Sequence, residues 1–209
     1  MLDLVRRSGV KYDAHYSLTT VDPPELVRFI KTFPEVEIHR PKQTMWQLIV
    51  KEGMPPTRLI RYCCRVLKEN GGNGRLCVTG IRQAESVKRS KRRMVENCLS
   101  GGNKTYLHPI IDWSNTDVWD YIRERNLPYC SLYDEGFKRL GCIMCPMGNT
   151  KGMMRQAERW PKYYDAYMRA FQKIADKGRS KNWKTAQDVM DWWIYNLPKG
   201  EVDQTVMFE

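Results

Sequence analysis

Short apolar runs alternate along this chain with segments whose apolar residues recur at helical spacing. The runs typical of strands cover residues 10–18, 36–39, 75–81 and 106–111. The segments with helical spacing cover residues 2–8, 25–32, 44–52, 57–70 and 115–125. Because strands and helices alternate, the pattern predicts an α/β fold with a parallel sheet and helices on both of its faces.

Turn-forming and polar residues mark the ends of several of these elements. Gly9 is expected to end the first helix, and Asp22 to cap the second one before two prolines. Residues 75–81 form a short apolar run after a glycine-rich turn, which favours a buried strand with Cys77 in the core. Residues 83–104 are mostly charged or small and polar, so we expect a mobile, basic surface segment there.

The last part of the chain differs from the rest. Residues 128–150 show no regular pattern, and helices rich in aromatic residues are expected at residues 151–177 and 185–195. This change predicts an α/β domain over residues 1–146 and a C-terminal helical extension over residues 147–209.

The composition is typical of a soluble globular protein. Hydrophobic residues make up 42% of the 209 positions and charged residues 28%, and no apolar run is long enough to span a bilayer. The N-terminal apolar stretch is too short and too charged for a secretory signal. We therefore expect a cytoplasmic protein with no membrane association and a sizeable core, for which both a monomer and an oligomer stay open.

The formal net charge of +11 indicates either a polyanionic partner, such as a nucleotide or a nucleic acid, or a solvated basic surface. The basic run KRSKRR at residues 88–93 has the same two interpretations, a contact for nucleic-acid phosphates or a solvated loop. No aromatic residue interrupts the run, so stacking on a single strand is not indicated.

The chain contains seven cysteines, and four of them form two close pairs. Cys63 and Cys64 are adjacent within a predicted helix, whereas Cys142 and Cys145 form a C-x-x-C between a glycine and a proline. Disulfides are not expected in a cytoplasmic protein, and thiolates suit an iron–sulfur cluster or zinc. Adjacent cysteines diverge, which favours separate iron atoms of a [4Fe–4S] cluster over one zinc ion. Zinc stays the alternative, as does a buried pair beside an unrelated redox pair.

Two other kinds of residue could take part in chemistry. Lys68 lies one helical turn after Cys64, where its charge could offset that of a thiolate-ligated centre, or where it could simply be an exposed helix lysine. The three histidines, His15, His39 and His108, are scattered along the sequence, and we expect them to be structural or solvated.

Several motifs in this sequence together resemble the phosphoadenosine-phosphosulfate (PAPS) reductase family. The run CCRVLK at residues 63–68 is similar to the C-C-x-x-x-K of PAPS and adenylyl-sulfate reductases. The run HPIIDWSNTDVW at residues 108–119 resembles the family's P-[IL]-x-D-W-x-x-x-D-V-W. The resemblance continues to the GCIMCP run at residues 141–146 and covers residues 2–146.

This resemblance implies a Rossmann-like parallel sheet of the adenine-nucleotide α-hydrolase type. It implies a [4Fe–4S] cluster held by four residues, Cys63, Cys64, Cys142 and Cys145. It also implies an adenine-nucleotide site at strand ends, with contacts from Ser17, Thr19 and Thr20 and from Arg82 and Ser86. Arg82 lies in a run similar to the family's G-[LIV]-R-x-x-x-S, where the arginine faces phosphate or sulfate. A surface salt bridge is the other interpretation of Arg82.

Two departures from the family pattern shape the functional expectation. The chain begins after the position of the S-G-G-x-D-S phosphate loop, and it has no E-C-G-x-H tail and no cysteine after Cys145. Sulfite-producing reduction is therefore not expected. The leading hypothesis is a member of this family, an oxidoreductase or sulfurtransferase, that acts on PAPS or ATP in sulfur transfer. The alternative is a non-catalytic module that binds nucleotide, nucleic acid or protein.

Overall fold

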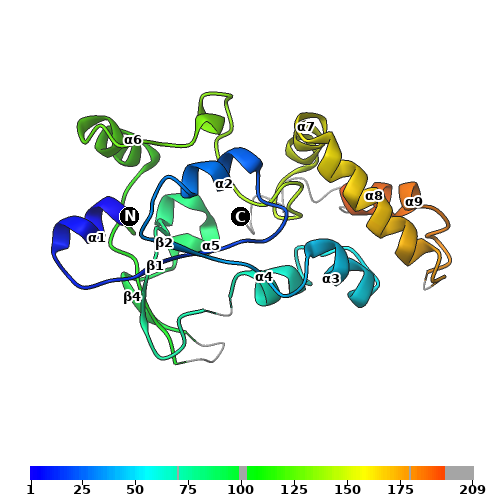
Figure 1. Ribbon diagram of the computed structural model, residues 1–209, viewed down its shortest axis with the longest axis horizontal. Helices are drawn as coiled ribbons and strands as arrows, with labels where there is room; N and C mark the ends of the chain where they lie inside the picture. The colour runs from blue at the N-terminus through cyan, green and yellow to red at the C-terminus, as the bar shows by residue number, and fades with distance from the viewer. Residues whose placement is uncertain (70, 99–102, 179, 196–209) are drawn as a thin grey trace.

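The computed structural model describes residues 1–69, 71–98, 103–178 and 180–195 (Figure 1). The α-helices are α1 Leu2–Ser8, α2 Pro24–Ile30, α3 Met45–Glu52, α4 Tyr62–Leu67, α5 Val87–Ser90, α6 Asn115–Glu124, α7 Thr150–Arg159, α8 Pro161–Ala175 and α9 Ala186–Tyr195. The strands are β1 Ala14–Ser17, β2 Val36–His39, β3 Leu76–Val78, β4 Val95–Asn97 and β5 Thr105–Leu107. Two 3₁₀ turns complete the described elements, η1 Gln83–Glu85 and η2 Ser131–Tyr133.

The described strands form two small sheets. In the first, β1 runs parallel to β2, and in the second β5 lies between β3 and β4. The β3–β5 pair is parallel, whereas β4 runs antiparallel to β5. The predicted α/β fold with parallel strand pairing is therefore confirmed, and β4 adds an antiparallel edge strand.

The strand β4 corrects the expectation of a mobile basic segment over residues 83–104. The described part of that segment holds η1, α5 and β4. Its cations are partly neutralised, because Arg89 pairs with Glu85 and Arg92 pairs with Glu96 at 2.5 Å. Ladder hydrogen bonds to β5 and these ion pairs explain why a charged sequence is ordered here. Residues 99–102 lie outside the described part of the chain.

Local hydrogen bonds account for other differences at element ends. Asp22 does not cap α2, because its carboxylate accepts the Thr19 N–H at 2.6 Å and Pro23 occupies the cap position. The helix predicted over residues 57–70 is limited to α4, because the Thr57 hydroxyl accepts the Ile60 N–H at 3.0 Å and holds a turn instead. Asn70 itself is outside the described residues.

The long helix predicted over residues 151–177 is interrupted. Helix α7 ends and α8 begins at Trp160, whose backbone leaves the helical region at φ −129° and ψ 67°. The following residue is Pro161, and a proline disfavours helical geometry in the residue before it. The described C-terminal part therefore contains three helices, α7, α8 and α9, and the chain changes direction between the first two.

The core lies on the helical side of the molecule, at the end where Figure 1 places α3, α7, α8 and α9. The α3 face predicted from spacing is confirmed, since Met45, Leu48 and Ile49 are all buried. The ring of Tyr167 in α8 packs edge-on against Trp46, with 4.6 Å between centroids, and against Trp193 of α9 at 4.8 Å. These rings join the N-terminal and C-terminal parts in one apolar cluster.

The strands are less buried than the sequence predicts. Leu76 and Val78 of β3 are 60% and 40% exposed, so the expected buried strand at residues 75–81 is wrong. Among the described residues, β3 pairs only with β5, which leaves one edge open and its apolar side chains at the surface. Cys77 is half-buried with its sulfur 3.6 Å from the Gly72 carbonyl, not in the core.

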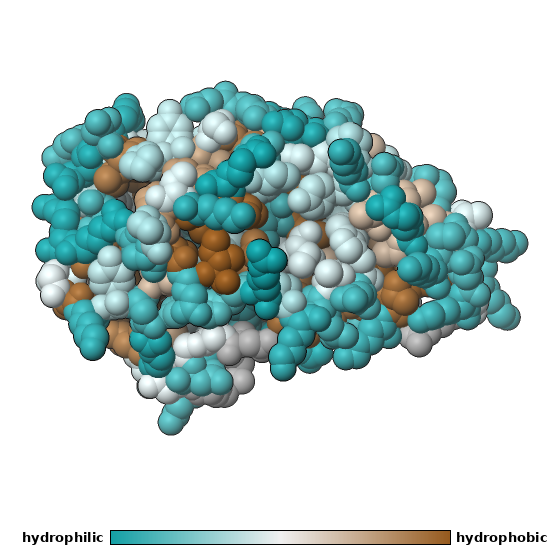
Figure 2. Space-filling view, viewed as in Figure 1, coloured by the Kyte–Doolittle hydropathy of each residue, from teal (hydrophilic) through white to brown (hydrophobic). Residues whose placement is uncertain are grey.

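The visible face of the molecule is mostly hydrophilic, with hydrophobic residues gathered near its middle (Figure 2). No helix in the described part of the chain is long and apolar enough to cross a bilayer.

Candidate functional site

The first cysteine pair lies in the short helix α4. Cys63 points into the apolar cluster and is buried, whereas Cys64 is half-buried. The guanidinium of Arg61, the residue at the helix N-cap, lies 3.2 Å from the Cys64 sulfur. The two neighbouring sulfurs therefore have different surroundings, one apolar and one cationic.

The second pair lies in a loop that is anchored from three directions. The Ile143 N–H donates to the Val21 carbonyl at 2.7 Å, and the Tyr167 hydroxyl donates to the Ile143 carbonyl at 3.0 Å. Arg58 donates from two guanidinium nitrogens to the carbonyls of Pro146 and Gly148, at 3.1 and 2.8 Å. These bonds hold the backbone on both sides of Cys142 and Cys145 in place.

The loop also contains a strained backbone position. Met144 lies between the two cysteines with φ 55°, a left-handed conformation that is rare for residues other than glycine. Its N–H donates to the side chain of Gln156 at 2.6 Å, and its side chain is fully buried. Packing and hydrogen bonding thus compensate for the strained turn between Cys142 and Cys145.

The fold brings the two cysteine pairs together. The pKa of Cys63 is raised by its contact with Cys64 and by burial, and further by the nearby sulfurs of Cys145 and Cys142. Burial also raises the pKa of Cys145, and the nearby sulfurs of Cys142 and Cys64 raise it further. Two cysteine pairs that lie far apart in the sequence therefore interact across one site.

Cys64 is the acidic member of this group. Its pKa is lowered by the hydrogen bond from Cys63 and by the charges of Arg61 and Lys68, which outweigh the opposing effect of burial. Because the pKa of Cys63 is raised and that of Cys64 is lowered, Cys64 is the thiolate and Cys63 stays protonated. Thiolates are the form that binds soft metals.

The spacing of the sulfurs distinguishes two kinds of centre. Among the described His, Cys, Asp and Glu side chains, the one group with three ligand atoms within 4.8 Å of one another contains no cysteine. One tetrahedral zinc ion with Zn–S bonds of about 2.3 Å would require sulfurs about 3.8 Å apart. The four thiols are thus spread more widely than a single zinc ion requires.

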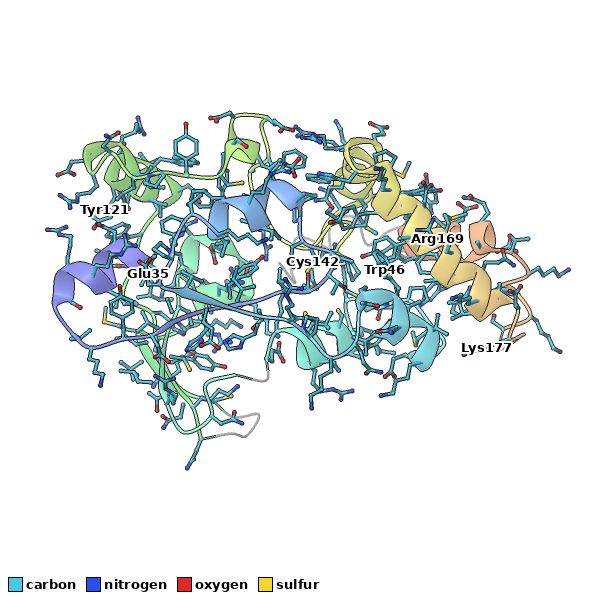
Figure 3. The ribbon with its side chains drawn as sticks, in the orientation of Figure 1. Glu35, Trp46, Tyr121, Cys142, Arg169 and Lys177 are labelled. Atoms are coloured by element: carbon cyan, nitrogen blue, oxygen red, sulfur yellow. The ribbon has the colours of Figure 1, made fainter. Side chains whose placement is uncertain are left out.

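Two polar groups predicted from the sequence lie against Cys142, whose place between the helices and sheets is labelled in Figure 3. The Cys142 sulfur is 3.5 Å from the hydroxyl of Thr19, which is buried. Burial of the Lys68 ammonium acts to lower the pKa of Lys68. The negative charges of Cys142, Asp22 and Cys145 outweigh this effect, so the pKa is raised. Lys68 is therefore a cation held beside the sulfurs.

The neighbouring residues Ser17 and Thr20 lie where the first sheet ends. Ser17 is the last residue of β1 and is half-buried. Thr20 has φ 67°, and its hydroxyl accepts the Met45 N–H at 2.9 Å, so it supports the start of α3. Ser17 therefore lies at the carboxyl end of a parallel strand and Thr20 follows it, at the edge where sheets of this kind bind ligands.

Arg82 and Ser86 form a separate group after β3. The Arg82 guanidinium donates to the Trp113 carbonyl at 3.3 Å and to the side chain of Asn115 at 2.8 Å, with Glu85 at 3.7 Å. The Ser86 hydroxyl caps α5 by accepting the Arg89 N–H at 3.3 Å. In this structure both residues are held by their own chain, and their contact with an anion stays a prediction.

The sequence analysis missed the groups that hold the cysteine loop and the contact between two histidines. Arg58, Arg61 and Tyr167 each reach a residue of the site that no local pattern connects to them. His15 and His39 are exposed, which agrees with the expectation of solvated histidines, but their ring nitrogens are only 2.8 Å apart, a contact that was not predicted. The signal was present, because one acid-x-His triplet lies at the start of β1 and another ends β2, and these two strands pair in parallel.

Comparisons with known proteins show the family to which this chain belongs. Residues 1–148 match the family described as phosphoadenosine phosphosulfate reductase domain. An adenosine 5'-phosphosulfate reductase of Oceanobacillus iheyensis is 31% identical over 172 residues, which cover 77% of this chain and 71% of the relative. An uncharacterized protein of Methanocaldococcus jannaschii is 33% identical over 133 residues, 60% of this chain. The chain spans about a third of the length of that relative, since the match covers 32% of it.

A solved structure supports the fold. The crystal structure of phosphoadenylyl-sulfate (PAPS) reductase from Candida auris, a phosphate complex, superposes with a TM-score of 0.52 and 20% sequence identity. The match covers 69% of this chain and 75% of that one. At this identity the likeness shows a common architecture of strands and helices.

Proposed function

The chain belongs to the phosphoadenosine phosphosulfate reductase domain family, and from this premise we propose that it binds an adenine nucleotide beside a [4Fe–4S] cluster. The proposed ligands of the cluster are Cys63, Cys64, Cys142 and Cys145. The observation that carries the proposal is the convergence of the two cysteine pairs on one site.

The residues at the site fit a cluster better than a single ion. None of the described cysteines forms a disulfide, so no disulfide competes for the four sulfurs, which suits a reducing cytoplasm. Sulfurs spread too widely for one tetrahedral zinc suit separate iron atoms. A bound [4Fe–4S] cluster would supply a soft, redox-active centre for sulfur chemistry.

Two cationic side chains lie beside the sulfurs and stabilise their negative charge in this proposal. Arg61 and Lys68 favour the thiolate form of the cysteines and offset the negative charge of four thiolates. Thr19 keeps its hydroxyl against Cys142, and its buried position excludes water from that side. The nucleotide would approach from the strand ends, where Ser17 and Thr20 lie.

The proposed ligand class is an adenine nucleotide such as PAPS or ATP. The relative from Oceanobacillus iheyensis is named for a sulfated adenine nucleotide, and the Candida auris protein for a phosphorylated form of it. An arginine fork suits a phosphate or sulfate, which is the role proposed for Arg82, with Ser86 beside it. We propose that the chemistry is sulfur transfer. A sulfite assay with adenosine 5'-phosphosulfate and PAPS tests this, because release of sulfite from either nucleotide would indicate a reductase instead.

The cluster is tested by anaerobic purification with iron and sulfide counts and a visible spectrum. We expect about four irons for each chain, and their loss when any one of the four cysteines is changed to serine. Cys77→Ser is the matched control, because Cys77 is half-buried on β3 and outside the group. Zinc without iron in anaerobic protein, or a cluster that survives all four substitutions, contradicts the proposal.

The nucleotide is tested by calorimetry with ATP, adenosine 5'-phosphosulfate and PAPS. Arg82→Lys keeps the charge but loses the planar fork, so we expect at least about tenfold weaker binding. Arg89→Lys is the control, since Arg89 lies in the same segment and pairs with Glu85. Equal affinities of the two variants for every nucleotide would exclude Arg82 from the site.

A further inference from the structure

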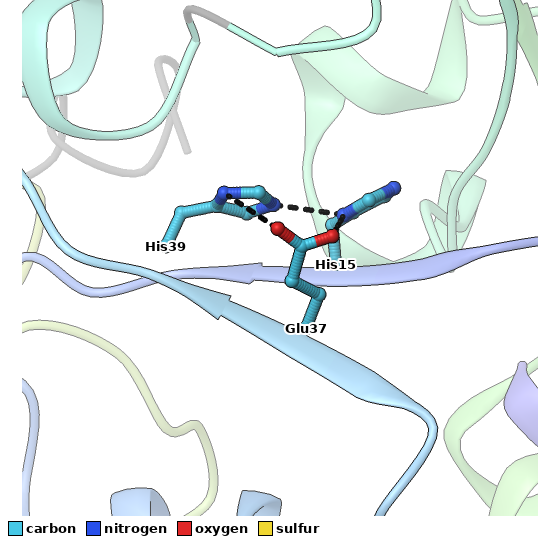
Figure 4. Close-up of side chains that lie close together, drawn as sticks. All are labelled: His15, Glu37 and His39. Atoms are coloured by element: carbon cyan, nitrogen blue, oxygen red, sulfur yellow. Dashed lines mark hydrogen bonds and ion pairs between the residues drawn. The ribbon is translucent and has the colours of Figure 1, made fainter.

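Three side chains converge on one face of the first sheet. Strands β1 and β2 are paired in parallel, with His15 opposite Glu37 and Ser17 opposite His39. Since side chains alternate between the faces of a strand, Glu37 and His39 share a face, and His15 meets them from the neighbouring strand. Figure 4 shows the three side chains gathered above the two strands.

The distances within this cluster are short. His15 Nδ1 lies 2.8 Å from His39 Nε2 and 3.5 Å from Glu37 Oε2, and the other Glu37 oxygen is 3.7 Å from His39 Nδ1. One ligand atom from each residue can be chosen so that all three lie within 4.8 Å of one another. No other group of three His, Cys, Asp or Glu side chains in residues 1–69, 71–98, 103–178 and 180–195 meets this criterion.

A fourth residue orients the first histidine. The far nitrogen of His15, Nε2, lies 2.6 Å from the Asp13 carboxylate, which Arg75 holds in turn at 2.6 Å. Arg75, and after it His15, keep the pKa of Asp13 well below its usual range, so Asp13 is an acceptor. We assign the His15 proton to Nε2 on this basis, which leaves a lone pair on Nδ1 directed at His39 and Glu37.

This arrangement is that of a metal ligand with its supporting carboxylate. A histidine that binds a metal commonly donates its other ring N–H to a carboxylate, which fixes its tautomer and orientation. Here Asp13 supplies that carboxylate from outside the cluster, so the cluster combines three close ligand groups with a residue that orients one of them.

We propose that His15, Glu37 and His39 bind a divalent transition metal ion of the zinc class. Two imidazole nitrogens and one carboxylate suit zinc, whereas magnesium and calcium prefer oxygen ligands alone. All three residues are exposed, so water can fill the remaining position. The site uses none of the cysteines and is independent of the proposed iron–sulfur function.

Binding requires one proton to move and a small displacement of the ligand atoms. Without metal, the His39 Nε2–H donates to the His15 Nδ1 lone pair. On binding, this proton leaves Nε2 for solvent and Nδ1 takes one up from solvent, so the ring stays neutral and Nε2 offers its lone pair to the metal. Zn–N bonds of about 2.0–2.1 Å in a tetrahedral site place ligand atoms about 3.3 Å apart. The two facing nitrogens would therefore separate by only about 0.5 Å.

The test is a zinc titration of protein labelled with ¹⁵N in its histidines. We expect the ring resonances of His15 and His39 to shift in a saturable way. His108 is the internal control, because it is fully buried and its Nδ1 is bonded to the Thr79 hydroxyl at 2.6 Å. Zinc taken up by the cysteines leaves the ring nitrogens of His15 and His39 unchanged, so the readout separates the two kinds of site.

Matched variants make the outcome decisive. His39→Ala and Glu37→Gln should each weaken the zinc effect on His15 at least about tenfold, and Asp13→Asn about 10- to 100-fold. Glu35→Gln is the control, since Glu35 lies two residues away and pairs with Arg6 outside the cluster. The proposal is overturned if the His15 and His39 resonances do not shift at millimolar zinc, or if they respond equally to zinc and magnesium. An unchanged His108 signal shows that each variant is folded.

Discussion

The helical end of this molecule and its sheets differ sharply in how they use hydrophobic residues. Helices α3, α8 and α9 bury a continuous aromatic cluster, in which Trp193 is 7% exposed. None of the residues in the five described strands is buried, and Leu76 is 60% exposed. Hydrophobic stabilisation scales with the area removed from water, so the helical end contributes more of it than the strands do.

The cysteine site lies between these two regions and depends on both. Its loop is attached to the helical core through Tyr167 and to the segment after β1 through Val21. The histidine cluster, in contrast, lies entirely on the sheet. Substitutions in the helical core should therefore affect the cysteine site but not the histidine cluster.

The largest expected effect is the loss of a core ring. Phe171 in α8 is fully buried and packs against Tyr167 and Trp193, so Phe171→Ala should lower the free energy of unfolding by about 3–5 kcal/mol. Leu76→Ala in β3 should cost less than about 1 kcal/mol, because most of that side chain already contacts water. Urea unfolding followed by tryptophan fluorescence measures both. Similar costs for the two variants would refute the division of the molecule proposed above.

A smaller effect is expected where the helical core holds the cysteine loop. Tyr167→Phe removes a buried hydroxyl and leaves the Ile143 carbonyl without its donor, so we expect a loss of about 1–3 kcal/mol. Because Ile143 follows Cys142, the iron content after anaerobic reconstitution should fall as well. Tyr163→Phe is the comparison variant, since its hydroxyl bonds the Asp22 carbonyl at 3.1 Å and not the loop. Unchanged iron content in Tyr167→Phe would show that the loop keeps its geometry without this anchor.

The two regions also differ in how far the sequence predicts them. Features set by local pattern were predicted correctly: the left-handed Gly9 after α1, the buried face of α3 and the extent of α6. The two cysteine pairs were recognisable because thiolate chemistry depends on residue type and spacing, which the sequence displays directly.

What failed depends on partners that are distant in the sequence. The run at residues 75–81 is apolar enough for a buried strand, but burial depends on what packs against it, and β3 has one strand partner among the described residues. The anchors of the cysteine loop reach across long separations, as from Tyr167 to Ile143. The His15–His39 contact depends on the register of β1 and β2, which the alternation of residues alone does not fix.

The smallest expected effect concerns a histidine on the sheet side. His108 follows β5 and is fully buried, and Glu96 lies 3.7 Å from its Nε2. Among the residues that the structure describes, this Nε2 has no hydrogen-bond partner. Burial lowers the pKa of His108 from its usual 6.5, although Glu96 opposes the shift. A histidine with a lowered folded-state pKa contributes stability above pH 6.5, and that stability is lost as the pH falls below this value, because the unfolded chain takes up the proton first.

We therefore expect the free energy of unfolding to fall below pH 6.5 with a slope of at most about 1.4 kcal/mol per pH unit from this residue. His108→Asn can keep the contact with Thr79 but does not titrate, so it should remove this part of the slope. Exposed His39 offers the control, because His39→Asn changes a group that water already reaches. If the free energy of unfolding has the same pH dependence in the wild type and in His108→Asn, the buried imidazole takes up its proton as easily as in the unfolded chain. In that case burial on the sheet side does not disfavour a charged group.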